Sequence, residues 1–269
     1  MPDSSRLAVL IDADNTSSSH AGAILEEVAR YGVPTVKRAY GDWTTQNLVR
    51  WKDELHRHAI QPIQQFAYTT GKNSTDSALI IDAMDLLYSD NVDGFAIVSS
   101  DSDFTRLATR LRESGKTVYG LGRRRTPASL VAACDRFIYL EVLGRRQAAG
   151  SPSEEPDERE ADEPDDHQAP APLPDLGSML LAAIDSTSHD DGWASLSAVG
   201  SHISRNNPSF DPRNYGYPKL VELARAQDYV DVEQNGDSPV RVRLRTSRPA
   251  KKSSPRRSTA KKATPAKGS

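Results

Sequence analysis

Several features that mark other classes of protein are scarce in this chain of 269 residues. Its single cysteine, Cys134, excludes an internal disulfide framework and a cysteine-rich zinc site. No apolar run approaches the roughly 20 residues that a membrane-spanning helix needs, so we expect no membrane partner. The first residues, MPDSSR, lead directly into a strand-like run and do not resemble a signal peptide. Together these absences favour a cytoplasmic protein.

Charge is unevenly distributed along the chain, although the net charge is only −3. Residues 154–166 carry nine acids and one arginine, and residues 248–267 carry eight Lys or Arg and no acid. Both blocks are too polar to bury a core, so we expect disorder in them. The basic block suits sequence-independent contact with phosphate backbones. The predicted organisation is a first domain, an acidic linker, a second domain and a basic tail, at residues 5–144, 145–172, 173–246 and 247–269.

The first domain alternates strand-like and helix-like segments. This alternation predicts an α/β fold with a parallel sheet flanked by helices. The expected strands are 7–13, 33–40, 60–67, 94–100, 116–122 and 136–141, and the expected helices are 17–32, 45–59, 74–89 and 103–115. In such sheets ligands bind at the carboxyl ends of the strands.

Four aspartates are candidates for a site at that edge. Asp12 ends the first strand, Asp101 and Asp103 follow the fourth, and Asp76 opens a helix. Each has a structural explanation, because acids also cap helices and favour their first turns. Carboxylates that converge in one cleft repel each other unless a cation lies between them. Oxygen ligands of this kind suit Mg²⁺ or Mn²⁺ and the phosphoryl chemistry these ions support.

Other polar and aromatic side chains are expected near this edge. Asn15 either orients a water at the metal or bonds its own turn. Lys72 is a candidate phosphate contact or a solvated loop lysine. Tyr40 and Trp43 either stack on RNA bases or pack at the strand end. Asp82 lies about 240° around its helix from Asp76, at roughly 100° per residue, and is left out of the metal ligands.

Three segments of the first domain, VLIDADN, KNSTDSALIIDAM and IVSSDSDF, resemble the NYN domain, a family of the PIN-like nucleases that includes the LabA-like proteins. The resemblance implies a parallel sheet between helices and a metal-dependent ribonuclease. It assigns metal binding and catalysis to Asp12, Asp76, Asp101 and Asp103, with Asn15 in support. Asp14 is less clearly part of this set. The family mechanism implies products with a 3′-hydroxyl and a 5′-phosphate.

A second enzyme class shares part of this pattern. DADNT also fits the nucleophile motif of haloacid-dehalogenase-like phosphatases, with Asp12 as nucleophile and Asp14 as general acid. That family needs a hairpin flap between the first strand and the first helix, whereas the helix here is expected within a few residues. Its lysine should also follow the Ser/Thr strand, and Lys72 precedes it.

The second domain reads as three helices and a hairpin joined by NGDS, which predicts a small winged-helix fold. Trp193 and the segment FDPRNYGYPKL resemble the LOTUS or OST-HTH domain, which implies RNA binding, or protein binding in some members. We expect Trp193 and Phe210 in the core. The candidate RNA contacts are Arg213, Asn214, Tyr215 and Lys219, since aromatic and basic neighbours suit RNA recognition.

The sequence therefore predicts a Mg²⁺- or Mn²⁺-dependent ribonuclease with an appended RNA-binding domain. A water activated near Asp12 and Asp101 would attack phosphorus in line with the leaving oxygen. The alternative is a regulator that binds RNA or a protein without cutting.

Overall fold

The structure is a computed structural model, and it describes residues 5–66, 74–144, 173–234, 236 and 238–245. The predicted acidic linker and basic tail lie outside the described residues, as does Lys72. The expectations for these segments stay predictions.

A six-stranded sheet forms the first domain, in the order β3-β2-β1-β4-β5-β6. All five pairings between neighbouring strands are parallel, which confirms the predicted α/β class. The strands are β1 (Arg6–Asp12), β2 (Val33–Gly41), β3 (Gln61–Gln64), β4 (Gly94–Val98), β5 (Thr117–Gly122) and β6 (Arg136–Tyr139).

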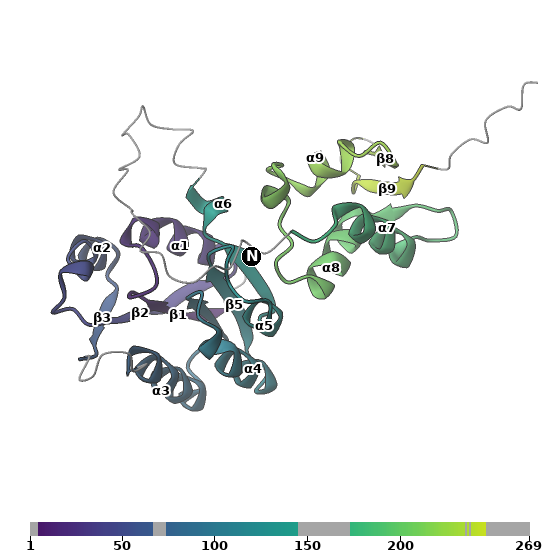
Figure 1. The fold of residues 1–269 in the computed structure, drawn as a ribbon. Helices are drawn as coiled ribbons and strands as arrows, with labels where there is room; N and C mark the ends of the chain where they lie inside the picture. Colours follow the sequence, from purple (N-terminus) through teal and green to yellow (C-terminus); the bar gives the residue numbers. More distant parts are fainter. Residues whose placement is uncertain (1–4, 67–73, 145–172, 235, 237, 246–269) are drawn as a thin grey trace, which may run out of the picture.

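Helices cover both faces of this sheet (Figure 1). One face carries α3 (Ser74–Ser89), α4 (Thr105–Glu113) and α5 (Ala128–Ala133), and the other carries α1 (Ala21–Val28), α2 (Trp51–His58) and α6 (Glu141–Gly144). Alternate residues of β1 supply the two cores: Leu10 packs with the first set of helices, and Val9 and Ile11 pack with the second. Burial on both faces explains why β1 reads as a continuous apolar run.

The strand order reverses between β1 and β4, because β2 and β3 lie on one side and β5 and β6 on the other. β1 and β4 pair directly, with Ile11 opposite Val98. In open α/β sheets such a reversal opens a crevice at the carboxyl ends of the strands. The segments after β1 and β4 therefore meet at one edge, as the sequence predicts.

The second domain packs three helices against a three-stranded antiparallel sheet of order β7-β9-β8. Its elements are α7 (Leu176–Thr187), β7 (Ala194–Ser195), α8 (Leu196–Asn206), α9 (Leu220–Arg225), β8 (Val230–Glu233) and β9 (Arg241–Leu244). This arrangement confirms the predicted winged-helix class. Phe210 lies in the core as expected, and Trp193 is half-buried with the guanidinium groups of Arg241 and Arg243 over its ring.

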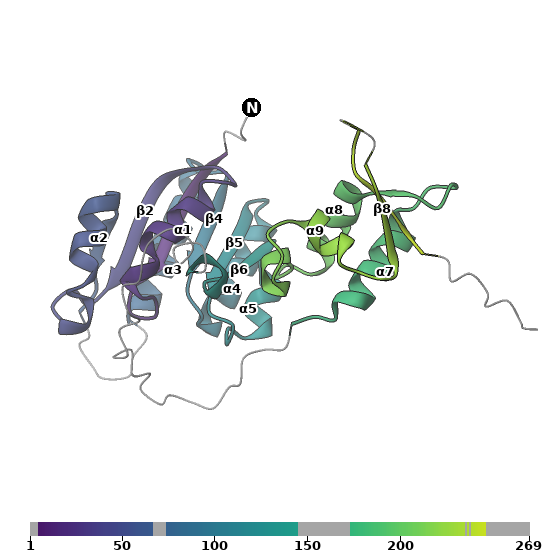
Figure 2. The ribbon, with the colours of Figure 1, turned by 90° about the horizontal axis from the view of Figure 1, so that it is seen from above.

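The second domain lies beside β6, at one end of the large sheet (Figures 1 and 2). The backbone N–H of Phe137 donates to the carbonyl oxygen of Pro208 at 2.8 Å. Arg213 forms two hydrogen bonds to the buried carboxylate of Glu27, at 2.8 and 2.9 Å. A polar contact thus joins the domains. Over the described part of the chain, no helix is both long and apolar enough to cross a membrane.

Candidate active site

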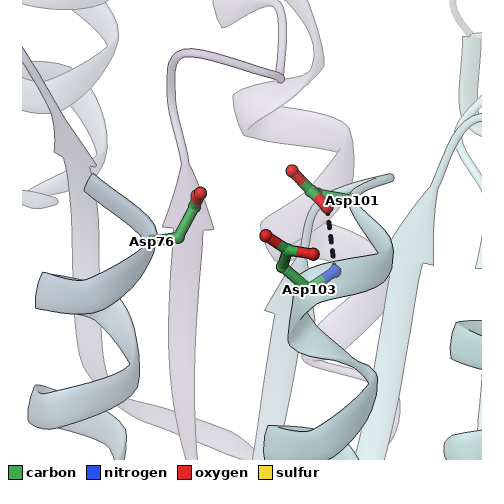
Figure 3. Close-up of side chains that lie close together, drawn as sticks. All are labelled: Asp76, Asp101 and Asp103. Atoms are coloured by element: carbon green, nitrogen blue, oxygen red, sulfur yellow. Dashed lines mark hydrogen bonds between the residues drawn. The ribbon is translucent and has the colours of Figure 1, made fainter. Parts of the chain in front are cut away.

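Three aspartates converge at the carboxyl edge of the sheet (Figure 3). Asp76, Asp101 and Asp103 each offer one carboxylate oxygen, and these oxygens all lie within 4.8 Å of one another. Asp76 comes from the first turn of α3. Asp101 and Asp103 come from the turn after β4, where the 3₁₀ helix η3 (Ser102–Phe104) leads into α4. The helices place side chains from distant parts of the chain face to face.

The local turn after β4 fixes two of these side chains. Asp101 caps η3, and its Oδ1 accepts a hydrogen bond of 2.8 Å from the backbone N–H of Asp103. The expected structural role as a cap is therefore real, but it uses only one carboxylate oxygen of Asp101. Figure 3 shows the Asp76 carboxylate facing this pair from α3. Asp101 can therefore cap η3 and contribute an oxygen to the aspartate cluster at the same time.

Asp12 is held at the base of this edge, with its side chain almost fully buried. Ser99 donates its hydroxyl to Asp12 Oδ2 at 2.8 Å, and the backbone N–H of Asn15 donates to Oδ1 at 3.3 Å. Burial raises the pKa of Asp12 to about 7, with smaller contributions from the charges of Asp76 and Asp14. Asp12 is not in the group of three whose oxygens lie within 4.8 Å. Its role as a ligand stays a prediction.

Neighbouring acids also affect Asp76. Burial and, to a smaller extent, the charges of Asp101, Asp103 and Asp14 together raise the pKa of Asp76 to about 6. Asp14 lies close by, because its Oδ2 accepts a hydrogen bond of 2.9 Å from Thr75 at the start of α3. Among the described groups, no lysine or arginine contributes to the pKa of Asp76. Negative charge from four aspartates is therefore concentrated at this edge.

The donor set fits a small divalent cation. An octahedral Mg²⁺ or Mn²⁺ binds oxygens at about 2.1 Å, so adjacent ligands lie about 3 Å apart and opposite ligands about 4 Å apart. The three oxygens, within 4.8 Å of one another, need to approach by at most about 2 Å to meet that geometry. A cation would also relieve the repulsion that raises the pKa of Asp76. The residues present therefore suit the predicted ion in number, chemistry and spacing.

Comparison with known families agrees with this geometry. The NYN domain profile matches residues 6–141. This chain belongs to the NYN domain family. The OST-HTH/LOTUS domain profile matches residues 171–242. The NYN domain, a PIN-like nuclease fold, is thus followed by a LOTUS domain of the RNA-binding type, which confirms the predicted order of the two.

Solved structures with similarity to this chain include the following three. A protein of unknown function from Vibrio parahaemolyticus is 18% identical, with a TM-score of 0.44, and the match covers 52% of this chain and 95% of that one. A Chromobacterium violaceum protein is 42% identical over 26% and 79% of the two chains, with a TM-score of 0.23. An uncharacterised Nitrosomonas europaea protein is 31% identical over 37% and 92%, with a TM-score of 0.25. Among curated proteins there is no match.

The segment between β1 and α1 bears on the alternative phosphatase prediction. After β1 ends at Asp12, the chain forms a turn and a short 3₁₀ helix, η1 (Ser18–His20), and enters α1 at Ala21. All residues of this connection are described, and they include no hairpin flap. The NYN domain therefore lacks the insertion that a haloacid-dehalogenase-like phosphatase needs at this position.

Two aromatic side chains of the NYN domain were candidates for base stacking. Tyr40 is fully buried, and its hydroxyl donates a hydrogen bond to Asp82. A buried ring has no free face for a base, so Tyr40 is left out of the interface we propose. Trp43 is partly buried, and its indole N–H donates to the carbonyl oxygen of Ile63 at 3.0 Å. Its contact with RNA stays a prediction.

Asp82 has a structural role, in agreement with its exclusion from the metal ligands. It pairs with the guanidinium of Arg38 and accepts the hydrogen bond from Tyr40. These partners lie on β2, so Asp82 ties α3 to the sheet below it. Asp82 therefore points from α3 toward Arg38, whereas Asp76 points toward Asp101 and Asp103.

Three of the four LOTUS candidates for RNA contact have partners inside the protein. Arg213 pairs with Glu27 and Asp211. Asn214 is buried and donates to the carbonyl oxygen of Ser209 at 3.1 Å. The Tyr215 hydroxyl donates to the carbonyl oxygen of Pro174 at 2.8 Å, and Lys219 is exposed. Only Lys219 of this set is readily available to RNA here. The RNA contacts of all four stay predictions.

Sequence reasoning missed two side chains that hold the site. Ser99 links both loops of the edge, because its hydroxyl donates to Asp12 and accepts the backbone N–H of Asp101 at 3.1 Å. Thr75 links α3 to Asp14. A serine directly after a buried strand was the available signal for Ser99. Nothing in the sequence indicates that Thr75 turns toward Asp14.

Proposed function

We propose that this protein is a Mg²⁺- or Mn²⁺-dependent ribonuclease that hydrolyses phosphodiester bonds at the carboxyl edge of its NYN domain. The observation that carries the proposal is the convergence of Asp76, Asp101 and Asp103 within 4.8 Å. The LOTUS domain would deliver RNA to this edge, and the match to its family supports that role. A cytoplasmic location and protein partners of the LOTUS domain remain parts of the same proposal.

The three converging aspartates would hold the divalent cation. When bound there, such an ion supplies positive charge that stabilises the charge developing on the phosphate and eases deprotonation of the attacking water. Ser99 keeps Asp12 in place through Oδ2. Asp12 Oδ1 is then the atom that can take a proton from the water, because burial raises its pKa to about 7. The backbone N–H of Asn15 donates a hydrogen bond to the same Oδ1 atom and helps to hold the carboxylate in position.

Cleavage of RNA by the purified protein tests this function. Single-stranded and structured RNAs are incubated with Mg²⁺, with Mn²⁺ or with EDTA. The expected result is metal-dependent cleavage that leaves a 3′-hydroxyl and a 5′-phosphate. Asp101→Asn should lower the cleavage rate by at least about 100-fold, the size expected for the loss of a central electrostatic group.

The matched control is Asp85→Asn, an exposed acid nine residues after Asp76 on α3 and therefore more than two helical turns away from it. It should cleave at the wild-type rate. Equal activity of wild type and Asp101→Asn would locate the chemistry elsewhere or in a contaminant. RNA binding that EDTA leaves unchanged, without cleavage of any substrate, would instead favour the non-catalytic regulator.

A further inference from the structure

A run of three arginines follows β5 at the same edge of the sheet as the aspartates. Arg123, Arg124 and Arg125 form the connection from β5 to α5. The backbone N–H of Arg123 donates to the hydroxyl of Ser100 at 2.8 Å, and the N–H of Ser99 donates to the carbonyl oxygen of Leu121 at 3.0 Å. These bonds hold the arginine loop directly beside the loop that carries Asp101.

The loop also lies beside the LOTUS domain. The backbone N–H of Arg124 donates to Glu141 at the start of α6, at 2.9 Å. The charge of Arg124 is close enough to Tyr215 of the LOTUS domain to act on its pKa. In Figure 1, the β5–α5 region faces the LOTUS domain across one end of the sheet. Arg124 is thus placed between the acidic cluster and the second domain.

Two guanidinium groups of this loop are available for a ligand. Arg124 is half-exposed and Arg125 is exposed. Within the described ranges, neither guanidinium has a hydrogen-bond or ion-pair partner. Ten other arginines in the described residues pair with acids, as Arg213 does with Glu27. The guanidinium groups of Arg124 and Arg125 instead lie beside a concentration of negative charge without such a partner among the residues that the structure describes.

Electrostatics explains why a nuclease needs them there. RNA is a polyanion, and the cluster of Asp12, Asp14, Asp76, Asp101 and Asp103 repels it before a cation binds. Exposed charges act over about 8 to 10 Å at moderate ionic strength, so cations must lie next to the cluster to offset that repulsion. Arginine suits the task because its planar guanidinium bonds phosphate oxygens in pairs.

We propose that Arg124 and Arg125 bind the phosphodiester backbone of RNA where the strand passes between the aspartate cluster and the LOTUS domain. This inference rests on the proposed function and adds the surface that holds the substrate. The contact is to phosphates, so it carries no base preference. Sequence or structure preference would come from the LOTUS domain.

Binding measured without catalysis tests the proposal. A fluorescent single-stranded RNA of about 20 nucleotides, longer than the roughly 4 to 16 that one single-strand-binding fold covers, is titrated with the full-length protein in EDTA at several salt concentrations. The Arg124→Gln/Arg125→Gln variant should bind about tenfold more weakly at low salt. Its slope of log affinity against log salt should be shallower by about 0.7 for each lost phosphate contact.

The control removes two charges elsewhere. Lys52→Gln/Arg57→Gln changes two exposed cations on α2, and the sheet order places the strands next to α2 away from β5. It should retain wild-type affinity and slope. Thermal unfolding checks that both variants are folded. An equal effect of the two double variants would overturn the proposal, because general charge would then explain binding, and so would no effect of either.

Cleavage separates this proposal from the proposed function. If the wild type binds RNA through the loop but never cleaves it with Mn²⁺, the nuclease function fails and the RNA contact stands. If the Arg124→Gln/Arg125→Gln variant binds RNA with wild-type affinity and cleaves dilute RNA at the wild-type rate, the contact fails and the nuclease function stands. The expected result is a raised KM with little change in kcat, since the loop is assigned to binding.

Discussion

Two groups of acids in this protein have opposite electrostatic environments. At the carboxyl edge, burial and neighbouring acids raise the pKa of Asp12 to about 7 and that of Asp76 to about 6. At the domain contact, burial alone would also raise the pKa of Glu27 and Asp211, but Arg213 outweighs it and lowers both. Carboxylates thus raise one another's pKa at the site that we propose for a cation, whereas an arginine stabilises their charged form at the domain contact.

The difference lies in whether the protein supplies its own cations. Arg213 bonds both Glu27 and Asp211, and Arg136 lies 3.6 Å from Asp211. The joint is therefore complete without a ligand. At the carboxyl edge, the charges of three acids raise the pKa of Asp76, and among the described residues no cation lowers it. Acids that raise one another's pKa in this way are typical of sites that bind a cation.

The largest effect on stability is expected from breaking the joint. Arg213→Gln removes one partner of a buried ion pair, a change that typically costs about 3 to 5 kcal/mol. The LOTUS domain should then separate from the NYN domain, which small-angle X-ray scattering detects as an increased radius of gyration. Denaturant unfolding measures the loss of stability.

The control for this change is an exposed ion pair. Arg6→Gln disrupts a pair with Asp93 in which both side chains are about half exposed, so it should change the stability far less than Arg213→Gln does. Scattering and unfolding curves of Arg213→Gln that match those of Arg6→Gln would contradict the account of the joint.

The two acid groups should also respond oppositely to pH. A raised pKa in the folded state means that the folded protein binds protons more tightly, so the contribution of Asp12 and Asp76 to stability falls as pH rises from about 4 to about 7. Lowered pKa values at Glu27 and Asp211 give stability that is present above about 4 and is lost at more acidic pH.

Thermal unfolding with and without Mn²⁺ checks this difference. Protons and the cation compete for the same carboxylates, so Mn²⁺ should raise the Tm more at pH 8 than at pH 5.5. Arg213→Gln should leave that pH dependence unchanged, because it alters the other acid group. An equal rise in Tm with Mn²⁺ at both pH values would contradict the proposal that the cation binds the carboxylates with raised pKa values.

The smallest expected effect is on the metal-free protein. Asp76→Asn removes one charge from the repelling group, and it should stabilise the protein in EDTA at pH 8 by about 0.5 to 1 kcal/mol. The exposed Asp85→Asn on the same helix should change stability by less than about 0.5 kcal/mol. A loss of stability in Asp76→Asn would mean that its carboxylate has a partner that favours its charged form.

Backbone patterns predict the fold and the meeting of the segments after β1 and β4 at one edge of the sheet. The apolar run of β4 indicates a strand buried on both faces, and parallel pairing then brings the segment after it next to Asp12. Helical direction excludes Asp82 from the site, and the structure pairs it with Arg38. These inferences succeed because strand and helix periodicity are local properties of the sequence.

Side-chain partners are the part that the sequence does not reveal. Arg213 lies 186 residues from Glu27, and no local pattern links the two. Tyr40 reads as a strand-end aromatic, but its position in β2 directs the ring into the core beneath α3. The bonds of Ser99 likewise depend on how two loops meet. Such pairings are set by tertiary packing, which single-sequence reasoning does not reach.

Calorimetric titration of Mn²⁺ into the metal-free protein tests the central claim most directly, because it needs neither RNA nor turnover. Wild type and Asp85→Asn should bind the ion with the same affinity, and Asp101→Asn should bind it at least about tenfold more weakly. Absence of binding to the wild type, or equal affinity in Asp101→Asn, would show that the converging aspartates do not form a cation site.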